Sequence, residues 1–142
     1  MSIIRQLLNY LFCNCGFTSF KITLTANQIK TGNTIPIDIP ELSAPGAGYA
    51  WSIVMAELKY TFGTAPFTSA TAFLITDTAS IEQMVSGVVL NAQTNCFCKF
   101  LSTGSSDTAI VENKKVSIVT NADSATGNGS CIIYGVARKV QV

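Results

Sequence analysis

Apolar and polar residues alternate along most of this chain, in short runs that end at turn-forming residues. The run from Phe20 to Thr25 places Phe, Ile and Leu at every second position, and this period of two predicts a strand with one buried face. Similar alternation, or enrichment in aromatic and β-branched residues, marks further segments. The predicted strands are residues 20–25, 35–40, 49–60, 71–76, 85–90, 95–101, 116–119 and 131–142.

Prolines interrupt the second predicted strand. Pro36 and Pro40 cannot donate a ladder hydrogen bond, so residues 35–40 are expected to form an edge strand or the end of a strand. Residues 77–84 are predicted to hold a helical turn. Residues 121–129 are too rich in Asn, Asp, Ser and Gly for regular structure, and we expect a polar turn region there.

The spacing of these elements defines the fold class. Roughly seven to nine short strands, with turn signals about every 8 to 15 residues, leave no room for the crossover helices of a parallel sheet. The 142 residues suffice for one domain with its own core. We therefore predict an all-β fold, an antiparallel β-sandwich or barrel over residues 17–142.

Residues 1–16 follow a different pattern. Isoleucines and leucines recur there at helical spacing and would form one apolar stripe, and Gly16 is a suitable helix stop. We predict a short amphipathic helix or arm that docks on another chain; the alternative is that it packs on its own domain. The residues expected to bind a partner are Ile3, Ile4, Leu7, Leu8, Leu11 and Phe12.

Charged residues are scarce in this chain. They make up 12% of the residues, against about 25% in ordinary domains, while 48% of the residues are hydrophobic. We expect neighbouring subunits to cover much of the surface. The nine Lys and Arg residues are scattered along the sequence and the net charge is +1, which argues against nucleic acid as a partner. No stretch reaches the roughly 18 apolar residues of a membrane helix, so no membrane partner is expected.

The residue types argue against an enzyme. Histidine is absent, which removes the commonest general base and metal ligand. The eight carboxylates lie singly and mostly near turns, where turn roles explain them. Glu57 is the exception, because it lies inside the longest predicted strand; it is expected to pair with Lys59, Arg138 or a neighbouring chain. We predict no catalytic residues and no cofactor.

The five cysteines include two Cys-x-Cys pairs, Cys13/Cys15 and Cys96/Cys98, with Cys131 alone. Four thiolates could bind zinc, and a metal-stapled intracellular adaptor is one alternative function. Paired ligands of structural zinc sites are more often separated by two to four residues, so buried thiols in a reducing cytoplasm are the favoured interpretation. In a strand, Cys96 and Cys98 would share one face.

Aromatic residues suggest a second alternative, a carbohydrate-binding tip domain. Exposed rings at one end of the sandwich, such as Tyr49 or Phe67, would favour it. Rings within the 49–60 strand are expected to fill the core or a subunit interface instead.

The order of turn and strand motifs after Ile29 resembles that of a known class of proteins. The class is the small virion structural proteins of tailed bacteriophages, of the single jelly-roll kind that forms trimeric head fibres or capsid-decorating subunits. The motifs are Ile29-Lys30-Thr31-Gly32-Asn33-Thr34-Ile35-Pro36-Ile37, Ala44-Pro45-Gly46-Ala47-Gly48-Tyr49, Lys59-Tyr60-Thr61-Phe62-Gly63, Val111-Glu112-Asn113-Lys114 and Ala125-Thr126-Gly127-Asn128-Gly129-Ser130.

This resemblance implies a single jelly-roll-like antiparallel β-sandwich that forms a homotrimer. The implied partners are copies of itself and the major capsid protein or another virion protein, and the implied location is the virion, assembled in the cytoplasm of a bacterial host. It also implies that Glu112, Asn113, Gly127 and Gly129 shape one end of the sandwich. Residues 1–16 lie outside the match, and we assign them to attachment.

Overall fold

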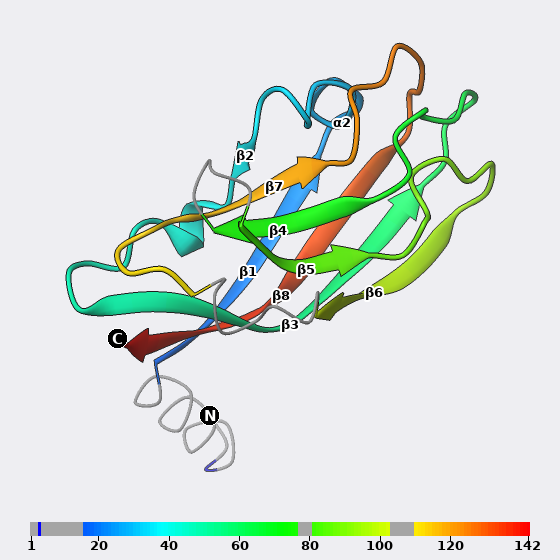
Figure 1. Cartoon of the computed structure of the whole chain (residues 1–142). Helices are drawn as coiled ribbons and strands as arrows, with labels where there is room; N and C mark the ends of the chain where they lie inside the picture. The colour runs from blue at the N-terminus through cyan, green and yellow to red at the C-terminus, as the bar shows by residue number, and fades with distance from the viewer. Residues whose placement is uncertain (1–2, 4–15, 77–80, 103–109) are drawn as a thin grey trace.

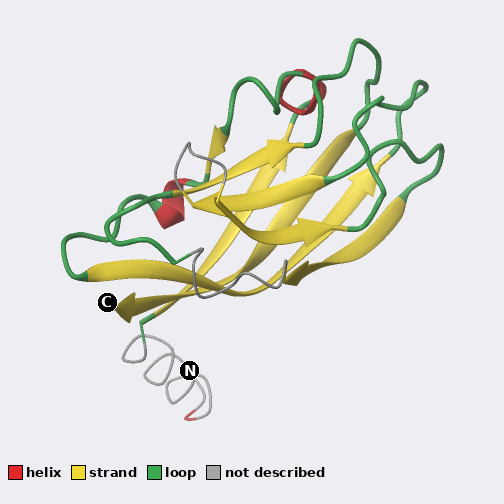
Figure 2. Cartoon of the chain, viewed as in Figure 1, coloured by secondary structure: helices red, strands yellow, loops and turns green. Residues whose placement is uncertain are grey.

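The computed structural model describes residue 3 and residues 16–76, 81–102 and 110–142. Strands are the predominant regular structure in this part of the chain (Figure 2). They are β1 (Phe17–Leu24), β2 (Ile37–Asp38), β3 (Tyr49–Thr61), β4 (Ala72–Thr76), β5 (Ile81–Ser86), β6 (Cys96–Ser102), β7 (Val116–Thr120) and β8 (Ser130–Gln141). Two short helical segments accompany them, α2 (Ala26–Lys30) and η1 (Pro40–Leu42).

The strand order is that of a jelly roll. The strands are hydrogen-bonded in the order β1-β8-β3-β6-β5-β4-β7-β2, and every pair is antiparallel. The sheet folds over at β6, where residues 96–99 pair with β3 and residues 100–102 pair with β5. Two layers result, β1-β8-β3-β6 and β2-β7-β4-β5 (Figure 1). This arrangement confirms the predicted all-β, jelly-roll-like sandwich.

The core lies between the two layers. Leu58, Tyr60 and Ile133 of the first layer are 0% exposed, as are Leu74 and Ile118 of the second. Each is flanked along its strand by residues that point the other way, as a pleated strand requires. The alternation in sequence therefore corresponds to an inner and an outer face on each layer.

Most predicted strands lie within a residue or two of the observed ones. The proline-containing segment forms β2 at the edge of the sheet, as expected for residues that cannot donate to a ladder. The predicted helical turn at 77–84 is wrong for its second half, because β5 begins at Ile81; residues 77–80 lie outside the described part. The predicted strand 85–90 is also wrong beyond Ser86: Val89 and Leu90 lie in a loop, where both N–H groups donate to the carbonyl oxygen of Ala70.

The loops predicted to shape one end of the sandwich lie at opposite ends of it, which corrects the expectation drawn from the resemblance. β7 separates them, because Glu112 and Asn113 precede this strand whereas Gly127 and Gly129 follow it. Asn113 accepts from the Gly46 N–H and donates its own N–H to the carbonyl oxygen of Tyr49. At the other end, Gly127 packs beneath the ring of Phe67.

Candidate interaction surface

Four apolar side chains form a row across the outer face of the second layer. The register places Val119 of β7 opposite Phe73 of β4, Phe73 opposite Val85 of β5, and Val85 opposite Leu101 of β6. Directly paired residues in an antiparallel sheet point to the same face. The four residues, Val119, Phe73, Val85 and Leu101, therefore make one continuous stripe, which we call the apolar row.

The apolar row faces away from the core. Leu74 and Ile118, the neighbours of Phe73 and Val119 along their strands, are 0% exposed and point inward, so the row must point outward. Leu101 is 67% exposed and the other three residues are partly exposed. An outer sheet face that meets water normally carries polar residues. Apolar residues on both faces of β4, in the run Ala-Phe-Leu-Ile, indicate a strand that is to be covered on both sides.

The cysteines of β6 and β8 belong to the core side of the first layer. Cys96 and Cys98 share one face of β6, as predicted, and Cys96 and Cys131 flank Tyr60 on its two neighbouring strands. Burial raises the pKa of all three thiols, and raises that of Cys131 to about 12, so these thiols stay protonated at neutral pH. Within the described residues no three Cys, Asp or Glu side chains are arranged to hold a metal ion. Cys13 and Cys15 lie outside the described residues.

Several carboxylates hold loops and strands in place. Asp38 forms an ion pair of 2.9 Å with Lys115, and this hydrogen bond, together with one from Ser117, lowers the pKa of the carboxyl group against the opposing effect of burial. Asp123 accepts from the backbone N–H groups of Asn33 and Thr34 and from the Thr34 hydroxyl. These contacts are structural, as expected for carboxylates near turns.

Glu57 lies on the outer face of the first layer. Tyr134 and Lys99 stand directly opposite it on the two neighbouring strands, whereas Arg138, one of the expected partners, stands opposite Ser52; pairing with a neighbouring chain stays a prediction. The pKa of the Tyr134 phenol is raised by desolvation, by the Glu57 charge and by its hydrogen bond with Glu57. Glu57 is thus part of a charged row of the sheet surface.

The two aromatic residues named for a carbohydrate site do not meet. Phe67 is 2% exposed and packs edge-on against Tyr60, with 6.3 Å between ring centroids. Tyr49 is 41% exposed at the other end of β3, where the Lys139 ammonium lies 4.4 Å from its ring centroid. Trp51 is buried and donates to the carbonyl oxygen of Ser43. One of the two expected rings is therefore in the core.

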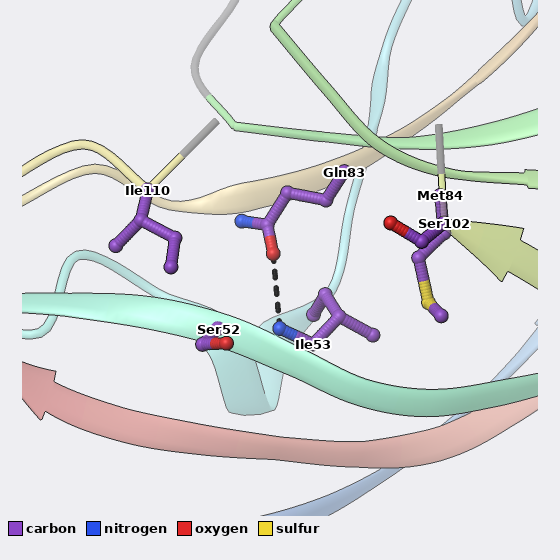
Figure 3. A pocket seen from close by; sticks show the side chains of 6 residues that line it. All are labelled: Ser52, Ile53, Gln83, Met84, Ser102 and Ile110. Atoms are coloured by element: carbon purple, nitrogen blue, oxygen red, sulfur yellow. Dashed lines mark hydrogen bonds between the residues drawn. The ribbon is translucent and has the colours of Figure 1, made fainter. Parts of the chain in front are cut away.

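A small cavity of about 50 Å³ lies between β3 and β5 (Figure 3). It is lined by Ser52, Ile53, Gln83, Met84, Ser102 and Ile110. The Gln83 amide accepts from the Ile53 N–H at 2.9 Å and donates to the Trp51 carbonyl oxygen and to the Thr76 hydroxyl. Gln83 thus takes the place of a neighbouring strand beside the bulge of β3 at Ile53 and Met55. A cavity of this size has room for little more than a water molecule.

The arm residues fall almost entirely outside the described part of the chain. Ile3 is described and is 78% exposed. Ile4, Leu7, Leu8, Leu11 and Phe12 are not described, so their partner-binding role stays a prediction. In the described residues, no helix combines the length and hydrophobicity needed to cross a membrane.

Comparisons with solved structures find weak likeness to chains from three virus structures, each with a TM-score below 0.5. No known protein family and no curated protein sequence matches it. A chain of the cyanophage Pam1 capsid asymmetric unit is 11% identical, with a TM-score of 0.45 over 87% of this chain and 83% of that chain. Desmodium yellow mottle tymovirus gives 10% identity and a TM-score of 0.36, over 89% and 88% of the two chains. Mud crab tombus-like virus gives 11% and 0.28, over 89% and 81%.

Proposed function

We propose that this protein is a structural subunit of a virus particle that assembles with copies of itself through the apolar row. The observation that carries the proposal is the row of Val119, Phe73, Val85 and Leu101 on an outer sheet face. A low share of charged residues, 12%, supports it, because a subunit inside an assembly needs less solvated surface.

Contact between subunits gains free energy by removing the row from water. Each Å² of apolar area buried contributes about 25 cal/mol, reduced by the cost of ordering the partners. The strands hold the row rigid, so little is lost in ordering it. The homotrimer implied by the phage resemblance is the assembly we propose.

The N-terminal segment supplies the second contact in this proposal. Its apolar residues, Ile3 to Phe12, attach the subunit to the major capsid protein or to another virion protein, in the manner of a capsid-decorating or head-fibre subunit. Assembly takes place in the cytoplasm of a bacterial host. The absence of histidine from the whole sequence fits a structural role over a catalytic one.

Protein quantification in purified particles of the encoding virus tests the role. The proposal predicts many copies per particle, in a fixed ratio to the major capsid protein, that remain bound after density-gradient purification. Recovery of the chain only in the soluble fraction of infected cells would contradict it.

Deletion of residues 2–13 tests the attachment. The truncated protein is expected to fold and to keep its subunit contacts, because β1 begins at Phe17, but to be lost from particles. Incorporation is measured against the full chain in the same particles. A matched control replaces the polar residues Gln6 and Asn9 with Ala, which leaves the apolar stripe intact and should preserve incorporation. Normal incorporation of the truncated protein would rule out attachment through this segment.

A further inference from the structure

Four cations that are scattered in the sequence lie on the outer face of the first layer. The register places Lys21 of β1, Tyr134 of β8, Glu57 of β3 and Lys99 of β6 in one row. The next row contains Ile132, Lys59 and Phe97, and Arg138 of β8 points to the same face. Since directly paired residues share a face, we call Lys21, Lys59, Lys99 and Arg138 the basic face.

The basic face carries an excess of positive charge. Its four cations are exposed, and Glu57 is the carboxylate among them, which leaves a charge of +3 (four minus one). The ion pair between described residues joins Lys115 to Asp38, so no described carboxylate forms an ion pair with any of the four cations. A net positive sheet face attracts a polyanion.

Aromatic rings lie beside two of the cations. Phe97 is 53% exposed and stands directly opposite Lys59. Tyr134 is partly exposed and lies directly opposite Lys21. Exposed rings next to cations can stack on bases while the cations hold phosphates, which is how sequence-tolerant sites bind single strands.

A groove gives this arrangement room for a ligand. Its volume is about 300 Å³, and it is lined by Lys59, Tyr60, Asn95, Cys96 and Phe97. Lys59 and Phe97 line it from the outer face, whereas Tyr60 and Cys96 point to the core side, so the groove lies beside the basic face at the end of this strand pair. The groove is largely apolar, as the flat surface of a base requires.

We propose that the basic face binds single-stranded nucleic acid, with phosphates on Lys21, Lys59, Lys99 and Arg138 and a base against Phe97. The face spans β1 to β6, about 14 Å across at roughly 4.8 Å per strand, which suits a few nucleotides. Most of this site lies on the first layer, opposite the apolar row, and the two surfaces approach each other at β6, where Lys99 and Leu101 are two residues apart. An acidic protein would also satisfy the cations, but it would have no need of the exposed ring beside the groove.

Binding of a fluorescent 30-mer of deoxythymidine to the full chain tests the proposal. Changing Lys21→Ala and Lys59→Ala together should weaken binding by about tenfold or more. It should also reduce the slope of log affinity against log salt by about 1.4, since each contact with a single strand contributes about 0.7. The charge-matched control is Lys30→Ala with Lys114→Ala, two cations outside the basic face, and it should retain most of the affinity. Equal losses in the two double variants would overturn the proposal.

Two further measurements separate stacking from charge alone. Phe97→Leu keeps an apolar side chain but removes the ring, and it should weaken binding by about tenfold; affinity equal to that of the unchanged protein would contradict the stacking contact. Polyglutamate of similar length should compete poorly with the oligonucleotide. If it binds as tightly, the face is a site for acidic proteins and the nucleic-acid proposal fails. Circular dichroism confirms that each variant is folded.

Discussion

Gly127 shows how single residues hold the loops of this sandwich. Its φ is 109°, a conformation that suits glycine, and a Cβ atom there would lie 2.1 Å from the Phe67 ring. Gly46 has a similar φ of 101°, but a Cβ atom there would have no neighbour within 4 Å. Comparing substitutions at the two glycines therefore distinguishes the free-energy cost of backbone strain from that of steric overlap.

We predict that Gly127→Ala lowers the free energy of unfolding by about 3 kcal/mol, from backbone strain and overpacking together. Gly46→Ala should cost only about 1 kcal/mol, from strain alone. Urea unfolding of both variants measures the difference. Equal losses would show that Phe67 moves aside without cost.

Tyr60 is a core residue whose polar atom is buried without compensation. Its hydroxyl is the buried side-chain oxygen without a hydrogen-bond partner in the described residues, and burial raises the pKa of the phenol. Tyr60→Phe removes an unsatisfied group and should increase the free energy of unfolding by about 1 kcal/mol. Tyr49→Phe, at a side chain that is 41% exposed, is the control and should change it little. A destabilised Tyr60→Phe protein would imply that the hydroxyl has a partner after all.

At the scale of elements, Asp123 joins the loop after β7 to the turn after α2. The hydrogen bonds from the Thr34 hydroxyl and the Thr34 and Asn33 N–H groups lower the pKa of its carboxyl group below the ordinary 3.8. A carboxyl group with a lowered pKa stabilises the folded state fully above its unfolded pKa. That contribution is lost as the pH falls below 3.8 through the lowered folded pKa.

The pH dependence can be measured directly. Asp123→Asn should be less stable than the unchanged protein at pH 7, and the difference should shrink as the pH falls below 3.8. Urea midpoints of both proteins across this range give the comparison. A stability difference that does not vary with pH would show that the charge of Asp123 is not what holds the two loops.

Strictly alternating elements could be predicted from the sequence, and elements that depend on distant partners could not. β1 and β8 follow their hydrophobic pattern closely, whereas a bulge between Leu74 and Ile75 breaks the pairing of β4 with β5. This irregularity turns Gln83 of β5 toward the core, so the sequence of β5 does not show the apolar–polar alternation expected of a strand. The short helix α2 was missed, although Thr25 and Gln28 form a capping box at its N-terminus.

Neither surface proposed here is visible in the sequence without the register. Phe73, Val85, Leu101 and Val119 become neighbours only through the pairing of four strands. Lys21 and Lys99 are likewise far apart in sequence. Their scattered positions predicted no nucleic-acid partner, whereas the register of the sheet places them in one row. Composition indicated that some surface must be covered, but not which one.

At the scale of the whole molecule, the two outer faces of the sandwich differ in chemistry. The second layer presents the apolar row, and the first presents the basic face. The two layers pack face to face (Figure 1), so the two surfaces lie mostly on opposite sides and adjoin at β6, which contributes Lys99 to one and Leu101 to the other. A subunit built in this way can contact its copies on one side and a polyanion on the other.

The mass of the full chain in solution tests the central claim, that the apolar row joins copies of this protein. We predict an oligomer at micromolar concentration by light scattering, and a smaller species for Leu101→Lys, since that side chain is 67% exposed and its replacement should not unfold the domain. Thr23→Lys, on the opposite outer face, is the matched control and should leave the mass unchanged. A monomeric full chain, or a Leu101→Lys protein of unchanged oligomeric mass, would contradict the account.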